Sequence, residues 1–311
     1  MYRELYRFGG MTFALESDAP LERSPVCEAF RVPDGVPDHT ICLRFSDALP
    51  TPPTDALRRD DVFRWQAGAQ RHLLQWVSAP GDIPHFTYAV TNGAHTDVIF
   101  ASAYRTGASV STVLEAVGLF DVFAERGMLV LHSAYIVTRT GEAILFSGPS
   151  GIGKSTQAAL WQRCAGARVV NGDRALVNVE NKTANGIFYA GTSGISENVT
   201  APIRAIVLLG QSSENRLFIP SPRAAFAGVL SQCAYYEWDV SSAEKMTACA
   251  ARLVSDVPVL RMDCLPDATA VETLRGKLGG ILYGTDEHRA TAVGLSPRAC
   301  LRKGHPACGK L

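Results

Sequence analysis

The stretch GPSGIGKST, residues 148–156, lies between the apolar run AILFS (143–147) and the segment QAALWQRC (157–164). It fits the pattern Gly-x-x-x-x-Gly-Lys-Ser, in which the glycines let backbone N–H groups turn inward around a phosphate. We expect a strand before this loop and a helix after it, because a helix directs the positive end of its dipole toward a bound anion. This order favours a nucleotide phosphate site over a chance glycine-rich turn.

The roles expected within this site follow from the chemistry of Mg²⁺-nucleotide binding. Lys154 would reach the β- and γ-phosphates, and the Ser155 hydroxyl would bind Mg²⁺. The first acidic residue after the loop is Asp173, and we expect it to bind the metal and to take the proton of a hydroxyl acceptor. The alternative is an ordinary turn aspartate in N-G-D. The residues expected to bind ATP are Gly148, Ser150, Gly151, Ile152, Gly153, Lys154, Ser155 and Thr156.

The pattern of apolar and turn-forming residues divides the chain into three regions, residues 1–108, 109–283 and 284–311. The first contains short β-like runs such as MTFAL, TICLRF, HFTYAV and TDVIFA, and we expect a mostly antiparallel, β-rich region. The second mixes helices and strands, so the fold class is mixed α/β. The third has no clear periodicity and is expected to be disordered.

The region 109–283 is expected to begin with one amphipathic helix over 109–127. A hairpin follows, made of MLVLHSAYIV (128–137) and AILFS, with the turn RTGE between them. Further strands are expected at 167–173, 174–179, 187–191, 203–210 and 257–263. Helices are expected at 154–161, 221–236, 241–256 and 267–283.

The composition excludes several classes of protein. Lys plus Arg and Asp plus Glu number 30 each, so no global field recruits nucleic acid or an anionic membrane. No stretch resembles a signal peptide, and no apolar run reaches 18 residues. We therefore expect a cytoplasmic location. The eight cysteines form no C-x-x-C pair, and we expect them to be free thiols. Cys300, His305 and Cys308 are residue types that bind zinc, but the sequence offers no fourth ligand near them. The sequence is compatible with a homo-oligomer.

Three segments together resemble the nucleotide core of HPr kinase/phosphorylase and of phosphoenolpyruvate carboxykinase. They are LHSAYIV (131–137), GPSGIGKSTQAALW (148–161) and VVNGDRALV (169–177), and the resemblance covers residues 128 to 282. It implies a phosphoenolpyruvate-carboxykinase-like P-loop core, with His132 near the reacting phosphate and Asp173 acting on the acceptor proton and the metal. Arg174 departs from that family, which has a second acidic residue there.

The stretch AGTSGISENVTAPIRAIVLL (190–209) is similar to a loop and strand of HPr-kinase-like proteins. Ser193, Gly194 and Asn198 are candidates for the acceptor side, and Arg204 for stabilising phosphoryl charge. The alternative is a polar loop that leads into a buried strand. Residues 1–108 lack a counterpart of the N-terminal domain of HPr kinase, which implies an acceptor other than HPr.

The sequence leaves three functions open. The first is an ATP-dependent kinase that phosphorylates a hydroxyl of a small molecule or peptide. The second is a non-catalytic nucleotide-sensing module, in which ATP orders the SGISEN loop (193–198) for a partner. The third is a classical P-loop kinase in which Asp263, at the end of VPVLRMD, binds the metal.

Overall fold

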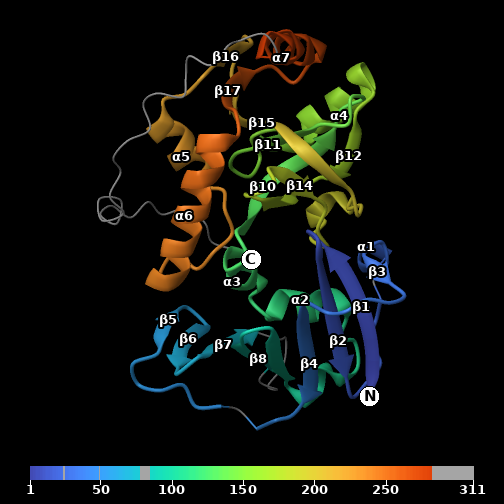
Figure 1. Ribbon diagram of the computed structural model, residues 1–311, viewed down its shortest axis with the longest axis vertical. Helices are drawn as coiled ribbons and strands as arrows, with labels where there is room; N and C mark the ends of the chain where they lie inside the picture. Colours follow the sequence, from blue (N-terminus) through green and yellow to red (C-terminus); the bar gives the residue numbers. More distant parts are fainter. Residues whose placement is uncertain (24, 49, 78–84, 282–311) are drawn as a thin grey trace.

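The computed structural model describes residues 1–23, 25–48, 50–77 and 85–281, and it contains two β-sheets arranged along the long axis of the molecule (Figure 1). The tail expected to be disordered, including Cys300, His305 and Cys308, lies outside these residues. Helices and sheets are both present, so the mixed α/β class expected from the sequence is confirmed. No helix within the described residues is long and apolar enough to cross a membrane.

The first sheet, β1–β9, is built from the N-terminal part of the chain and is drawn in blue to teal in Figure 1. Its order is β3-β1-β2-β4-β9-β8-β7-β6-β5, and β2–β4 and β4–β9 pair in parallel while the other neighbours pair antiparallel. A short helix α1 (Pro25–Glu28) and a 3-10 turn η1 (Ser102–Arg105) accompany it. The strands are β1 (Tyr2–Phe8), β2 (Met11–Ser17), β3 (Arg31–Val32), β4 (His39–Phe45), β5 (Leu57–Arg59), β6 (Val62–Ala67), β7 (Gln70–Val77), β8 (His85–Asn92) and β9 (His95–Phe100).

The helix expected over 109–127 is two helices, α2 (Val110–Ala116) and α3 (Leu119–Ala124). The chain breaks at Gly118, which has a φ of +66°, a left-handed conformation that glycine adopts without a steric penalty. A Cβ there would lie 2.9 Å from the Leu73 side chain, so the break also lets β7 approach closely. Apolar periodicity alone could not locate this break.

The second sheet contains the expected hairpin, in which β10 (Met128–Val137) pairs antiparallel with β11 (Ala143–Ser147). β11 pairs in parallel with β15 (Thr200–Gln211), and β15 in parallel with β17 (Val259–Cys264). Because β10, β13, β14 and β15 are also neighbours, the pairing returns to β11 and closes a ring. The remaining strands are β12 (Arg168–Asn171), β13 (Arg174–Asn178), β14 (Thr183–Asn185) and β16 (Arg216–Phe218).

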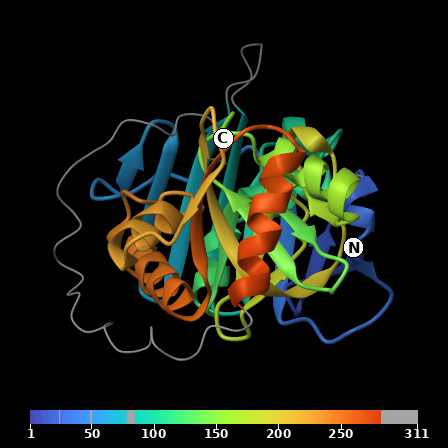
Figure 2. The ribbon, with the colours of Figure 1, turned by 90° about the horizontal axis from the view of Figure 1, so that it is seen from above.

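Helices cover both faces of the parallel strands β11, β15 and β17 (Figures 1 and 2). On one face, α4 (Lys154–Ala165) and α7 (Ala268–Ile281) pack on Ile144 and Phe146. On the other, α5 (Pro222–Leu230) and α6 (Val240–Asp256) pack on Leu145. Successive residues of β11 therefore point to opposite apolar layers, as expected for a strand buried on both faces.

Two further elements expected from the sequence do not form as predicted. No strand forms at 187–191; the buried Asn171 side chain binds the carbonyls of Ile187 and Tyr189, and a 3-10 turn η2 (Gly191–Ser193) follows. The helix expected over 221–236 ends at Leu230, because the backbone after it pairs with β10, where the Ala234 N–H donates to the Val130 carbonyl. In both cases a long-range contact replaces the local preference.

A continuous apolar core joins the two sheets across the boundary expected at residue 108. Phe8 and Phe13 of the first sheet stack with their ring centroids 4.5 Å apart, and Phe123 of α3 and Phe188 meet Phe8 edge-on. Leu176 of β13 belongs to the same buried cluster. The first sheet thus packs directly against the strands that follow Asp173.

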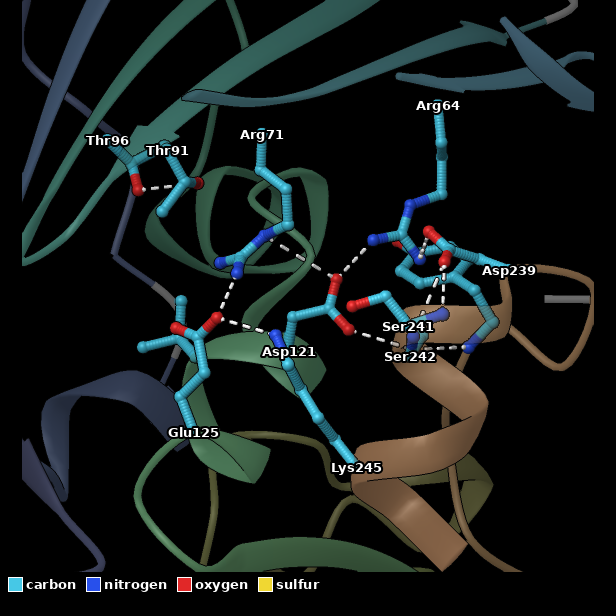
Figure 3. A network of polar contacts seen from close by, with 12 residues as sticks. Arg64, Arg71, Thr91, Thr96, Asp121, Glu125, Asp239, Ser241, Ser242 and Lys245 are labelled. Carbon is cyan, nitrogen blue, oxygen red and sulfur yellow. Dashed lines mark hydrogen bonds and ion pairs between the residues drawn. The ribbon is translucent and has the colours of Figure 1, made fainter. Parts of the chain in front are cut away.

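A buried polar network also links the first sheet to the helices α3 and α6 (Figure 3). The guanidinium of Arg64, on β6, forms ion pairs with Asp121 of α3 and with Asp239, at 3.2 Å, at the start of α6. It also lies over the Tyr236 ring, 3.9 Å from the centroid. The side chains of Arg64 and Asp121 are both only 5% exposed, so each depends on the other for compensation of its charge.

The edge of this network is exposed to solvent. Arg71 and Lys245 both pair with Glu125, and the Lys245–Glu125 contact of 2.9 Å joins side chains that are about one-third exposed, at 34% and 32%. Solvent screens such pairs, so they contribute little to stability. The network therefore has a buried centre and a weak rim.

We predict that Asp121→Asn lowers the free energy of unfolding by about 3 kcal/mol, because it leaves the buried Arg64 charge with less compensation. Lys245→Met, at the rim, should cost less than about 1 kcal/mol. Urea unfolding of both variants measures the difference. Equal effects of the two substitutions would contradict the assignment of a buried centre.

Candidate active site

The glycine-rich loop connects the end of β11 to the start of α4. Gly148, Gly151 and Gly153 have φ values of +148°, +77° and +110°, which side chains rarely adopt. A Cβ on Gly151 or Gly153 would meet nothing within 4 Å, so the backbone of the loop is open on that side. Ser150, Ser155 and Thr156 are exposed around it. The loop can therefore turn its N–H groups toward an anion.

Lys154, the first residue of α4, is 7% exposed and folds back over the loop. Its ammonium donates to the carbonyls of Gly148, at 2.9 Å, and Pro149, at 3.1 Å. Burial lowers the pKa of this ammonium, and the negative charge of Asp173 opposes that shift. A lysine confined in this way supplies positive charge at a fixed place beside the loop.

His132 and Asp173 lie next to the base of the loop. Ser133 of β10 is opposite Ser147, the last residue of β11, and the Ser147 hydroxyl donates to the His132 carbonyl at 2.9 Å. The His132 Nε2 is 3.4 Å from the Asp173 Oδ1. The strand with His132 thus lies beside the strand that leads into the loop, as the hairpin predicted.

Asp173 occupies a break in the strand that flanks β10. β12 pairs with residues 135–137 of β10 and β13 with residues 128–132, and Tyr135 lies opposite Asn171 while His132 lies opposite Arg174. Between them, the Asn171 Oδ1 accepts hydrogen bonds from the N–H groups of Asp173 and Arg174, both at 2.9 Å. This turn, built by the N-G-D sequence, carries the Asp173 carboxylate toward His132.

Both oxygens of the Asp173 carboxylate have a side-chain partner. Oδ1 faces His132, and Oδ2 is 3.3 Å from the Nε of Arg174, whose guanidinium lies 4.7 Å from the centroid of the Tyr189 ring. The hydrogen bond from His132 holds the pKa of Asp173 below its ordinary value of 3.8, against the effect of burial and with help from Arg174. Asp173 is therefore ionised at neutral pH.

Ser193 and Gly194, expected on the acceptor side, lie in the turn that packs on this break. The Ser193 hydroxyl donates to the Ala190 carbonyl at 2.8 Å, and a Cβ on Gly172 would lie 2.3 Å from that hydroxyl oxygen. A Cβ on Gly191 would lie 2.6 Å from both Cβ and Cγ of Asp173. The turn 190–194 thus forms one wall beside Asp173.

The structure does not bring Asn198 and Arg204 to this site. The Asn198 side chain donates to the Arg7 carbonyl of β1, at 3.1 Å, whereas the backbone of its neighbour Glu197 pairs with Val170 of β12. Arg204 lies near the start of β15, where Ile203 is opposite Ala143, whereas the loop follows Ser147 at the other end of β11. Its guanidinium binds the Leu278 carbonyl and lies 3.9 Å from Glu142, so it anchors α7.

Asp263 is one strand further from the loop than β15. It lies opposite Gly210, and its carboxylate accepts a hydrogen bond of 2.7 Å from Arg261. A Cβ on Gly210 would collide with this pair, at 2.0 Å from the Asp263 Oδ1. The nearer strand β15 instead contributes Gln211, whose side chain donates to the Gly151 carbonyl at 3.2 Å. Asp263 is thus tied to Arg261 rather than directed at the loop.

Two positioning residues were missed by sequence reasoning. Asn171 is fully buried and binds both the turn at Asp173 and the backbone of 187–189, and the N-G-D sequence was its only local signal. Gln211 directly follows the apolar run of β15 and has an uncharged amide rather than a carboxylate. Asn171 and Gln211 were not considered as site residues because their side chains carry no charge.

No protein-family model matches the chain, and no curated protein matches it.

The packing of the 190–194 turn on Asp173 predicts different costs for two similar substitutions. Gly191 and Gly194 have φ values of +53° and +65°, but a Cβ on Gly194 would meet nothing within 4 Å. Gly194→Ala should therefore cost about 1 kcal/mol of backbone strain alone. Gly191→Ala should cost a further 1–3 kcal/mol or so, because its Cβ cannot rotate away from Asp173. Denaturant unfolding of both variants tests this, and equal losses would refute the contact.

Proposed function

We propose that this protein is an ATP-dependent kinase that transfers the γ-phosphoryl group of Mg²⁺-ATP to a hydroxyl of a small molecule or peptide. The observation that supports it most is the placement of the His132–Asp173 pair at the base of the glycine-rich loop that carries the buried Lys154. Phosphoryl transfer needs these parts together: donors for phosphate oxygens and a carboxylate for metal and proton. We infer a P-loop core like that of HPr kinase.

The residues fit ATP and Mg²⁺ in donor type. The open backbone at Gly151 and Gly153, the Lys154 ammonium and the first turn of α4 offer positive partners for phosphate oxygens. The exposed Ser155 hydroxyl and the Asp173 carboxylate are the oxygen donors that Mg²⁺ prefers. When bound, Mg²⁺-ATP supplies the phosphoryl group and the charge neutralisation. The chain itself orients the acceptor and receives its proton.

Asp173 would receive that proton with the help of its neighbours. As an ionised carboxylate it accepts a hydrogen bond from an incoming hydroxyl, and His132 beside it keeps the carboxylate in place. Arg174, where HPr-kinase-like proteins have a second acid, pairs with Asp173 and lies on Tyr189. It adds positive charge at the side of the wall formed by residues 190–194.

A second function is favoured by the same contacts. Because both Asp173 oxygens already face His132 and Arg174, few lone pairs remain for a metal ion. In a nucleotide-sensing module, nucleotide binding would reorganise these pairs and the adjoining SGISEN loop without transfer. Incubation with γ-labelled ATP and a cell extract separates the two functions: the kinase labels an acceptor, and the sensor labels none.

We predict that Lys154→Ala abolishes measurable binding of Mg²⁺-ATP, because the loop loses its buried positive charge. Lys277→Ala, which removes an exposed lysine from α7, is the matched control and should bind as the wild type does. Isothermal titration calorimetry measures both, with circular dichroism as a check on folding. Affinity like that of the wild type in Lys154→Ala would remove the loop from the proposed site.

We predict that Asp173→Asn lowers the rate of phosphoryl transfer by roughly 10²–10⁴-fold while changing ATP affinity less, because the amide keeps the shape and loses the basicity. Asp263→Asn is the control and should leave the rate unchanged, since that carboxylate binds Arg261. Single-turnover transfer to the acceptor found by labelling is the measurement. A large loss in Asp263→Asn with none in Asp173→Asn would instead favour the classical P-loop arrangement.

A further inference from the structure

The outer face of the first sheet gathers four metal-ligating side chains from three adjacent strands. The parallel registers place Glu16 of β2 opposite Cys42 of β4, and Cys42 opposite Asp97 of β9. His95 is two residues before Asp97, so its side chain lies on the same face of β9. The alternating residues Ile41, Leu43 and Val98 are buried on the opposite face, in the apolar core.

The ligand atoms of three of these side chains lie close together. The ligating atoms of Cys42, His95 and Asp97 all lie within 4.8 Å of one another. The His95 Nε2 is 3.4 Å from the Asp97 Oδ1, and the Cys42 Sγ is 3.5 Å from the Glu16 Oε2. In a tetrahedral zinc site, bonds of about 2.0–2.3 Å place neighbouring ligands about 3.3–3.8 Å apart. The edge between His95 and Asp97 falls in that range.

The charges around Cys42 have both signs. Two carboxylates flank the thiol on neighbouring strands, and Arg44 adds a positive charge two residues after Cys42 on the same face of β4. Arg3 forms an ion pair with Glu16, 3.4 Å from its Oε1. That pair uses the oxygen that points away from Cys42, so Oε2 remains directed at the sulfur. His95 and Asp97 are 46% and 55% exposed, which gives an ion a path from solvent.

We propose that Cys42, His95 and Asp97 bind a divalent transition metal of the zinc class, with Glu16 beside the thiol as a neighbouring negative charge. A thiol and an imidazole are ligands that Zn²⁺ and Co²⁺ favour, whereas Mg²⁺ and Ca²⁺ select oxygen alone. On binding, a sulfur–metal bond forms and the proton of the Cys42 thiol passes to solvent. The ion would join β4 and β9, and it is distinct from the Mg²⁺ proposed beside Ser155 and Asp173.

The test is a titration of the full chain, freed of metal, with Co²⁺ under reducing conditions. A cobalt–thiolate charge-transfer band should saturate at one equivalent and disappear when Zn²⁺ is added. Cys42→Ser should lose the band, while Cys164→Ser, which removes an exposed thiol from α4, should keep it. A Cys300→Ser/Cys308→Ser variant should also keep it, which separates this site from thiols of the tail.

Two further variants preserve the test if Cys42→Ser fails to fold. Asp97→Asn and His95→Gln change exposed side chains, and each should weaken Co²⁺ binding by more than about tenfold while the far-ultraviolet circular dichroism stays the same. Zn²⁺ should raise the Tm of the wild type and not that of Asp97→Asn. A wild type without the band, a band that persists in Cys42→Ser, or its loss in the tail variant would overturn the proposal.

Discussion

The buried carboxamide of Asn171 holds together the segments that surround Asp173. Its oxygen accepts the N–H groups of Asp173 and Arg174, and its nitrogen donates to the carbonyls of Ile187 and Tyr189. One side chain therefore breaks the strand beside β10, directs the Asp173 carboxylate to His132 and fixes the segment before the 190–194 turn. Removal of either half of this amide would leave buried polar groups unpaired, which is costly.

The first sheet supports this arrangement from outside. Its aromatic residues share a core with Leu176, which follows Asp173 on β13, and with Phe188, which precedes the turn. The ion pairs of Arg64 with Asp121 and Asp239 join the same sheet to α3 and α6. The N-terminal region thus shares its core with the rest of the protein. That core includes Phe188, which precedes the turn 190–194 beside Asp173.

The sequence predicted the order of elements around the candidate site well, because that order is local. The strand before Gly148, the helix from Lys154 and the hairpin through 139–142 each depend on short-range signals: an apolar run, glycines and a tight turn. Predictions about which side chains lie close together in space were confirmed for some residues and wrong for others. His132 and Asp173 meet, since adjacent strands carry them, whereas Arg204 lies at the far end of β15. The sequence of β15 alone does not show which of its ends lies beside the glycine-rich loop.

By itself, the sequence determined the glycine-rich loop with its flanking strand and helix, the mixed α/β class, and the turn chemistry of N-G-D, since these follow from backbone sterics and side-chain periodicity. Only the tertiary structure decided that Gly118 divides a helix, that residues 187–191 form no strand, and that Glu16, Cys42 and Asp97 lie in one row across three strands. Those outcomes depend on the registers of strands distant in the sequence. A register is chosen by the burial of whole faces, and no single segment carries that information.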